Sequence, residues 1–357
     1  MTNQSQDREG PRHDDSAVGA CPGGSRGGAV VLLRRLLVFA TVVLGLLWAP
    51  FHSDGQPAAK VARIGYLTPT SQPAREEVFR QELRRLGYAE GQNIVLEYRS
   101  ANGSYDRLPD LAAELVGLKV DVLVTVVTHA ALAAKKATAT IPIVMVGVSD
   151  PVGVGLVASL ARPGGNVTGT SALAANVVGK QLESLREMLP KASRVATLWN
   201  PANSVFQKLQ LAEVKAAATK LKVQLQLFEA RTPDQLDHAF TSIARQRPDA
   251  LLILADPMFG AHWARIAELA ARHRIPAVSG SREYADAGGL MTYGPDYFEV
   301  YQRAGRYVDQ ILKGGRPADL PVEQSTKFEL VVNARAAAGL GITIPRSLVG
   351  RADRVVE

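Results

Sequence analysis

The residues best suited to chemistry in this chain are hydroxyl, amide and carboxylate side chains that follow short apolar stretches. In chain order these positions are Thr70, Ser71, Thr125, Thr128, His129, Asp150, Asn200, Asp256 and Tyr293, with Ser279 and Ser281 in equivalent places. Hydroxyls beside the free N–H groups at a helix start can hold a carboxylate, because the helix dipole favours an anion there. An aspartate in the same place can hold an ammonium group through a charge-assisted hydrogen bond. The set therefore suits the binding of a small charged solute.

Each of these positions also has a purely structural explanation. Ser, Thr, Asp and Asn are the usual N-cap residues, and a cap stabilises a helix by about 1 kcal/mol whether or not a ligand is present. Asp150, Asn200 and Asp256 each precede a proline, and such pairs commonly start turns. His129 fits a helix N-terminus better than it fits a catalytic base. Capping and ligand contact both stay open at every position.

Patterns that would indicate catalysis or a metal site are absent from the sequence. None of the six histidines pairs with a carboxylate or another histidine at metal-ligand spacing. There is no Gly-x-Ser-x-Gly motif and no phosphate-binding Gly-Lys-Ser/Thr loop. Residues 153–158 match a relaxed dinucleotide fingerprint, but Asp150 would lie unfavourably near a pyrophosphate and no acid near residue 175 could bind a ribose. We therefore expect no catalytic residue, no metal and no cofactor.

Composition narrows the class of protein further. The chain has 357 residues, of which 46% are hydrophobic and one is a cysteine, so it is neither a disordered protein nor a disulfide scaffold. Its net charge of +7 is modest, and no basic run is interleaved with aromatics, so nucleic-acid binding has no support. The length allows two domains.

The first sixty residues differ from the rest. Residues 1–28 are polar and lack apolar periodicity, which predicts a disordered start. Arg34 and Arg35 then precede a continuous apolar stretch, residues 36–48, that is too short to span a bilayer comfortably. This layout is typical of a secretory signal peptide, with cleavage near residues 57–59. An uncleaved N-terminal anchor is the alternative.

The cysteine content is consistent with export. Cys21 lies ahead of the apolar stretch, so it would leave with the leader and the mature chain would hold no thiol. A lipid anchor would need a cysteine just after the apolar stretch. We therefore expect a non-lipidated protein of the periplasm.

From residue 61 onward, apolar strands alternate with amphipathic helices in two successive series. Strands are expected at 61–67, 94–98, 120–126, 141–147 and 166–170, and then at 194–199, 223–228, 250–254, 275–278, 290–293 and 327–332. Helices are expected between them, including a short one at 152–160 and longer ones at 297–312 and 334–340. Such an alternation predicts parallel sheets covered on both faces. In these sheets ligands bind beyond the carboxyl ends of the strands, where the polar residues named above lie.

The region after residue 61 resembles the bacterial ABC-transporter substrate-binding proteins with the type I periplasmic binding fold, the group that includes tryptophan/tyrosine-type uptake components. The resemblance is carried in order by residues 141–144, 149–152, 155–169, 198–201, 288–294, 307–314, 317–324, 327–333, 344–348 and 351–353. It implies an α/β fold of two doubly wound parallel-sheet lobes joined by a hinge that the chain crosses three times, near residues 172, 290 and 325. The domains would be 1–59 (disordered start and signal peptide), 60–172 with 291–325 (lobe 1), and 173–290 with 326–357 (lobe 2).

The resemblance also implies a function. The chain would be a monomeric extracytoplasmic receptor that captures an amino acid or a similar small carboxylate between the lobes and delivers it to an ABC permease with a cytoplasmic ATPase. Carried over by position, Thr70, Ser71, Thr125, Thr128, Asp150, Asn200, Asp256 and Tyr293 would touch the ligand. His129 stands where related proteins often have a proline, and its imidazole could add a donor for a carboxylate.

Three functions of other classes are alternatives. A sensor component would bind the same solute but signal to a membrane kinase. A nicotinamide-dependent α/β enzyme would need the 153–158 stretch to bind a dinucleotide. A transcriptional regulator of this fold would carry a helix-turn-helix where this chain has a leader.

Overall fold

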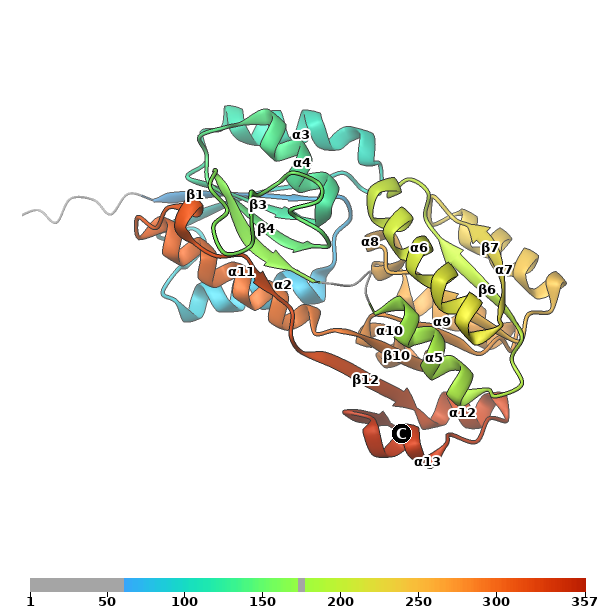
Figure 1. Cartoon of the computed structure of the whole chain (residues 1–357). Helices are drawn as coiled ribbons and strands as arrows, with labels where there is room; N and C mark the ends of the chain where they lie inside the picture. The colour runs from blue at the N-terminus through green and yellow to red at the C-terminus, as the bar shows by residue number, and fades with distance from the viewer. Residues whose placement is uncertain (1–60, 173–176) are drawn as a thin grey trace, which may run out of the picture. The chain divides into compact units, whose positions relative to one another are not determined.

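A computed structural model of the chain describes residues 61–172 and 177–357 (Figure 1). The predicted disordered start and signal peptide, residues 1–59, lie outside the described residues. Within the described residues the strands form two sheets, one of six strands and one of seven. No helix in this part of the chain is long and apolar enough to cross a membrane.

The six-stranded sheet is parallel throughout and has the order β11-β5-β4-β3-β1-β2. Its strands are β1 (Ala62–Thr68), β2 (Ile94–Ser100), β3 (Val122–Val126), β4 (Ile143–Val148), β5 (Val167–Ser171) and β11 (Glu323–Gln324). All residues of β3 and β5 are buried, as expected for central strands covered on both faces.

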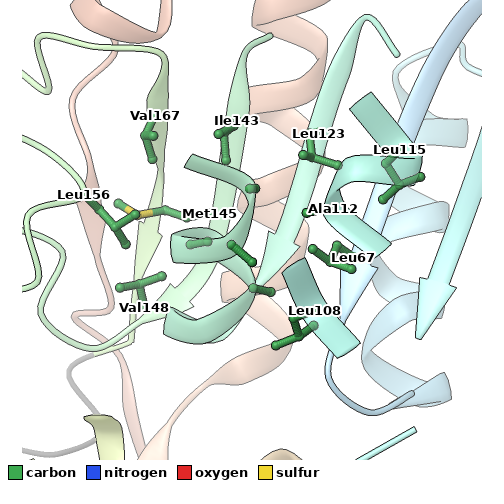
Figure 2. Close-up of a cluster of buried hydrophobic side chains, with 14 of the residues drawn as sticks. Leu67, Leu108, Ala112, Leu115, Leu123, Ile143, Met145, Val148, Leu156 and Val167 are labelled. Carbon is green, nitrogen blue, oxygen red and sulfur yellow. The ribbon is translucent and has the colours of Figure 1, made fainter. Parts of the chain in front are cut away.

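Helices cover both faces of this sheet (Figure 1). The 3-10 turn η1 (Tyr105–Arg107) leads into α3 (Leu108–Gly117), which packs with α4 (Val127–Ala137) on one face; α2 (Pro73–Arg85) and α11 (Tyr297–Leu312) cover the other. Figure 2 shows the first of these interfaces, where Leu67 of β1 lies near Ala112 of α3 and Leu123 of β3 lies near Leu115. Met145 of β4 lies beside Leu156 in the same cluster. Side chains alternate between the two faces of a strand, so β1, β3 and β4 each contribute to both cores.

The seven-stranded sheet has the order β13-β12-β10-β9-β8-β6-β7. Its strands are β6 (Arg194–Trp199), β7 (Gln224–Glu229), β8 (Ala250–Ile253), β9 (Ala277–Ser279), β10 (Met291–Pro295), β12 (Phe328–Asn333) and β13 (Arg354–Val356). The remaining elements are α5 (Val178–Met188), α6 (Ser204–Leu221), α7 (Gln235–Gln246), α8 (Pro257–Gly260), α9 (Trp263–Arg272), α10 (Arg282–Asp286), η2 (Pro317–Asp319), α12 (Ala334–Leu340) and α13 (Arg346–Arg351). Helices α5 and α6 pack on one face, and α7 and α9 on the other.

The chain passes between the two sheets three times. It leaves the six-stranded sheet after β5, returns through α11 and β11, and enters the seven-stranded sheet again at β12. The passage predicted near residue 290 lies five residues later, after Pro295, because β10 pairs with β9 and β12 rather than with the first sheet. An apolar stretch predicts a strand but does not reveal which sheet that strand joins.

Two further expectations differ from the structure. Residues 152–160 form turns instead of a helix, since Gly155 has a left-handed backbone (φ +70°) and Asp150 Oδ1 accepts a hydrogen bond from the Gly153 N–H at 2.8 Å. The second sheet is not purely parallel, because β12 runs antiparallel to β10.

Candidate functional site

A small cavity lies beyond the carboxyl ends of strands from both sheets. On the side of the six-stranded sheet it is lined by the first turns of α2, α4 and α11 and by the end of β4; on the other side it is lined by the loops after β8 and β9 and by α6. Its volume is about 40 Å³. Pockets that bury a small molecule usually enclose roughly 300–1,000 Å³, so the walls must move apart before this one can take a solute of that size.

The backbone around the cavity is unusual at two positions. Val127, the first residue of α4, has a φ of +60°, and Gly147 in β4 has a φ of +67°. A β-branched residue in the left-handed region is a true outlier, and such strain costs about 1–3 kcal/mol. Gly147 sits at a bulge where β4 loses register with β5. Strain of this kind is concentrated at binding sites, and here both residues line the cavity.

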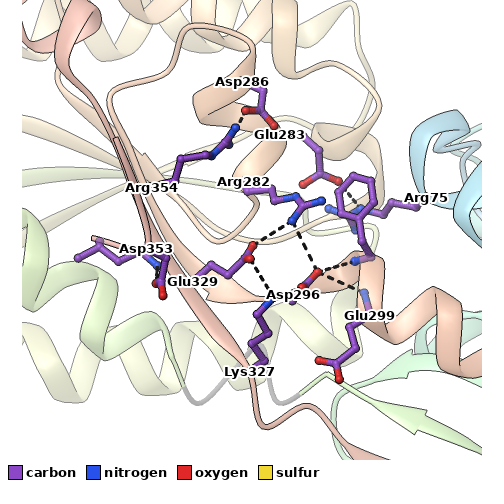
Figure 3. Close-up of polar contacts among 12 residues, drawn as sticks. Arg75, Arg282, Glu283, Asp286, Asp296, Glu299, Lys327, Glu329, Asp353 and Arg354 are labelled. Carbon is purple, nitrogen blue, oxygen red and sulfur yellow. Dashed lines mark hydrogen bonds and ion pairs between the residues drawn. The ribbon is translucent and has the colours of Figure 1, made fainter. Parts of the chain in front are cut away.

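Arg75 brings a buried positive charge to the cavity from the first turn of α2. Its side chain is only 7% exposed, its Nε donates to Glu283 Oε1 at 2.5 Å, and its Nη2 donates to Ser281 Oγ at 3.1 Å. Burial alone would lower the pKa of Arg75, but the Glu283 carboxylate outweighs burial and raises it. The guanidinium therefore stays charged, and it joins an element of the first sheet to α10 of the second (Figure 3).

Aromatic side chains form much of the remaining wall. Tyr297 and Tyr301 come from the first turns of α11, and Phe206 comes from α6. The Arg75 guanidinium carbon lies 4.0 Å from the centre of the Tyr297 ring, within cation–π distance. Burial raises the pKa of Tyr297 to about 12, so this phenol is neutral at physiological pH.

Asp256, the N-cap of α8, is the centre of a buried polar network. Its Oδ1 accepts from Asn200 Nδ2 and from the Met258 N–H, each at 3.0 Å, and its Oδ2 accepts from Asn203 Nδ2 at 2.9 Å and from Tyr105 Oη at 3.4 Å. Burial raises the pKa of Asp256, although these hydrogen bonds oppose the rise. Because Tyr105 belongs to the first sheet's half, this network also bridges the two sheets.

His129 belongs to the same region. Its ring lies 5.0 Å from that of Tyr105 in an edge-on arrangement, and burial lowers its pKa while a hydrogen bond with Asn203 opposes the fall. Its buried Nδ1 has no hydrogen-bond partner among residues 61–172 and 177–357. The imidazole is thus mainly neutral near pH 7.

The structure brings some of the predicted site residues together and leaves others apart. Thr128 and Asp256 line the cavity, while Asn200 and His129 lie in the network behind it. Five predicted site residues do not line the cavity: Thr70, Ser71, Thr125, Asp150 and Tyr293.

The local surroundings of these five residues differ from one another. Ser71 Oγ donates to Glu76 at 3.2 Å, and the Thr70 carbonyl accepts from Thr68 Oγ1 at 2.8 Å. Thr125 is fully buried within β3. Asp150 is exposed and closes the turn at Gly153, and the Tyr293 ring stacks on Phe328 at 6.4 Å.

Several cavity residues escaped the sequence analysis because it examined only positions directly after strands. Arg75 is the third residue of α2, and Tyr297 and Tyr301 lie on α11. A signal did exist for Arg75, since it falls on the buried stripe of α2 with Phe79 and Glu82 at helical spacing. A charged residue on such a stripe must meet a partner, which marks it for attention.

Comparisons with known proteins find relatives that cover most of this chain. The chain is 27% identical over 313 residues to the tyrosine-binding protein of Clostridioides difficile, covering 84% of this chain and 90% of that protein. A crystal structure of a domain protein from Vibrio cholerae superposes with a TM-score of 0.75 at 32% identity, covering 83% of this chain and all of the other. The structure of an ABC domain in complex with L-Trp from Streptococcus pneumonia superposes with a TM-score of 0.74 at 27% identity, covering 83% of this chain and 99% of the other.

The family comparison covers nearly all of the described chain. The family of ABC transporter substrate binding proteins matches residues 63–356, which confirms the predicted resemblance. The two α/β sheets are those of the periplasmic binding protein fold. The chain therefore belongs to the ABC transporter substrate binding protein family and is the substrate-binding component of such a transporter, not an enzyme.

Proposed function

We propose that this chain captures an L-amino acid, with an aromatic side chain preferred, in the cavity between the two sheets. The observation that carries the proposal is the composition of the cavity wall, which combines a buried guanidinium, aromatic rings and several helix N-termini. Relatives are a tyrosine-binding protein and a domain bound to L-Trp, which supports this ligand class.

The carboxylate of the solute is assigned to Arg75 and to the start of α4. Arg75 supplies a planar fork of donors that matches a carboxylate. The N–H groups of the first turn of α4, around Thr128, have no partner within the helix and carry the positive end of its dipole. Both features favour a carboxylate over a neutral group.

The side chain of the solute is assigned to the aromatic wall. Phe206, Tyr297 and Tyr301 come from elements on both sides of the cavity, so a ring bound among them would contact both. Aromatic rings bury a large apolar area and gain further from stacking or edge contacts. A non-aromatic side chain would lose part of this contact.

Capture requires relative motion of the two halves, because the cavity of about 40 Å³ is smaller than any amino acid of this kind. We therefore take the two predicted lobes, with their boundary moved to Pro295, as bodies that open and close about the three chain passages. A solute that touches both lobes favours the closed arrangement through its differential affinity for it.

The cellular context follows from the same proposal. The protein would act in the periplasm, as a monomer, and deliver its solute to a membrane permease driven by a cytoplasmic ATPase. The leader predicted from Arg34, Arg35 and the apolar stretch after them would export it.

A ligand screen tests the proposal. Purified protein is heated with each L-amino acid, with the D-isomers, and with sugars and organic acids, and its Tm is recorded. A ligand present at 100 times its Kd stabilises the fold by about 2.7 kcal/mol, so L-tryptophan or L-tyrosine should raise Tm by several degrees and their D-isomers should not. A shift with sugars alone, or none with any L-amino acid, would contradict the proposal.

A further inference from the structure

Arg75 lines the cavity and forms an ion pair with Glu283, and the proposed function leaves this pair unexplained. It joins α2 of the first lobe to α10 of the second, and both side chains are largely withdrawn from water, at 7% and 19% exposed (Figure 3). The separation of the two walls that a solute needs must break this pair. Breaking a buried pair is costly unless each charge finds a new partner.

One carboxylate oxygen of Glu283 can accept a further hydrogen bond. Its Oε1 accepts from Arg75, but its Oε2 is buried and has no hydrogen-bond partner among the described residues. A buried carboxylate oxygen without a donor is rare, because it loses its hydration without compensation. The arrangement therefore has room for one further donor beside the guanidinium.

Asp256, Asp150 and Glu76 do not offer this capacity. Asp256 already accepts four hydrogen bonds, which fills both of its oxygens. Asp150 is exposed to water, and its Oδ1 accepts from the Gly153 N–H. Both oxygens of Glu76 have donors, because Oε1 accepts from the Gln72 N–H and Tyr98 Oη and Oε2 accepts from Ser71 Oγ.

We infer that an amino-acid zwitterion inserts between Arg75 and Glu283, its carboxylate pairing with Arg75 and its ammonium pairing with Glu283. This inference rests on the proposed function and names the residue that selects for the ammonium group. One internal ion pair is exchanged for two pairs with the solute, so no buried charge is left alone. The walls separate by the width of the inserted group, which enlarges the cavity as binding requires.

The exchange makes Glu283 a determinant of specificity. A solute with a carboxylate but no ammonium would pair with Arg75 and leave Glu283 buried and unpaired. A solute with an ammonium but no carboxylate would leave Arg75 unpaired. Both kinds of solute lose affinity because one buried charge stays unpaired. The site therefore selects zwitterions over simple acids and amines.

The test compares three probes on two proteins by calorimetric titration. The probes are L-tryptophan, indole-3-propionate, which lacks the ammonium, and tryptamine, which lacks the carboxylate; the proteins are the wild type and Glu283→Gln. The variant should bind L-tryptophan about 10- to 100-fold more weakly, because a charge-assisted hydrogen bond is lost. It should bind indole-3-propionate more tightly than the wild type does, because no unpaired carboxylate remains.

These opposite signs separate the inference from a general loss of structure, which would weaken both ligands. Glu283→Asp, which keeps the charge, should restore the preference for L-tryptophan over indole-3-propionate. Asp286→Asn is the matched control, because Asp286 lies on the same helix and pairs with Arg354 away from the cavity; it should leave all affinities unchanged.

The outcomes also distinguish this inference from the proposed function. If the wild type binds L-tyrosine instead of L-tryptophan, the des-amino and decarboxylated analogues of tyrosine serve as the other two probes. If the wild type binds the amino acid but Glu283→Gln changes the affinities for the amino acid and for the des-amino acid in the same direction, the ion-pair exchange is wrong. The proposed capture of an amino acid is then unaffected. If Asp256→Asn shows the opposite signs instead, Asp256 holds the ammonium. If the wild type binds neither amino acid, both the function and the inference are overturned.

Discussion

The carboxylate of Asp256 accepts hydrogen bonds from three side chains and one backbone N–H, and the donors come from both halves of the protein. In the sequence this residue had two explanations, a helix cap and a ligand contact. The structure shows the helix cap, since the Asp256 side chain accepts a hydrogen bond from the Met258 N–H at the start of α8. Asp256 also lines the cavity, and its carboxylate holds the Asn200 and Asn203 amides in position.

Replacement of Asp256 by alanine should therefore act on stability. It leaves the two asparagine amides and a helix N–H without their acceptor, and each unsatisfied buried donor costs about 1–3 kcal/mol, offset in part by removing a buried carboxylate. We expect the free energy of unfolding to fall by about 2–4 kcal/mol, measured by urea denaturation. Tyr105→Phe removes only the 3.4 Å contact and should cost less than about 1 kcal/mol. Equal losses in the two variants would show that Asp256 is not the centre of the network.

At the scale of elements, one carboxylate adds polar contacts to the apolar packing between α2 and α11. Glu82 of α2 is 2% exposed; it accepts from Arg85 of its own helix and from Gln302 and Arg306 of α11. The pKa of Glu82 is lowered to about 2, mainly by the hydrogen bonds from Arg85. Hydrogen bonds from Arg306 and Gln302 lower it further, whereas burial opposes the fall. Since α11 carries Tyr297 and Tyr301, this contact also fixes one wall of the cavity.

The depressed pKa predicts how this contact depends on pH. A carboxylate whose pKa is lower in the folded than in the unfolded chain stabilises the fold above its unfolded pKa, roughly 4.3 for Glu, and loses that stabilisation as pH falls toward the folded value. Because both arginines are more than half exposed, we expect Glu82→Gln to lower the free energy of unfolding by only about 1–2 kcal/mol at pH 7. In urea titrations the difference from the wild type should shrink between pH 4.5 and pH 2. A difference that is constant across that range would contradict the assignment.

The sequence predicted those elements best whose signals are local. Helices 297–312 and 334–340 match α11 and α12 in full, because each combines apolar periodicity with an N-cap, Asp296 and Asn333. The helix expected at 152–160 failed because glycine conformation and the Asp150 turn override its apolar pattern. Strand β13 was missed, since it is short and exists only by pairing with the distant β12.

The same contrast applies to the site. Thr128 and Asp256 could be found because a parallel sheet places residues after its strands at one edge. Arg75 and the two α11 tyrosines could not be placed in this way, since they reach the cavity from within helices. Their position depends on how α2 and α11 pack, which is a tertiary property that strand ends do not reveal.

At the scale of the whole described chain, the order of strands and helices predicted two parallel α/β sheets, and the family resemblance implied three passages between them. It was not enough to place the second passage, which depends on β10 pairing within the seven-stranded sheet. The last two passages lie side by side, because the Asp296 N–H donates to the Lys327 carbonyl at 3.1 Å and the Lys327 ammonium contacts Asp296 Oδ2 at 2.8 Å. The Lys327 side chain is 58% exposed, so the ion pair adds little stability, and the backbone contact defines the arrangement.

The central claim is that an amino acid is held between the two sheets and contacts both. Amide hydrogen exchange of the whole protein, followed by mass spectrometry with and without saturating L-tryptophan or L-tyrosine, tests this claim most directly. We predict slower exchange in peptides from both walls together, around residues 127–131 on one side and 255–260 and 281–284 on the other, with no change in β7, far from the cavity. Protection confined to the peptides of one sheet, or protection elsewhere with none at these segments, would contradict it.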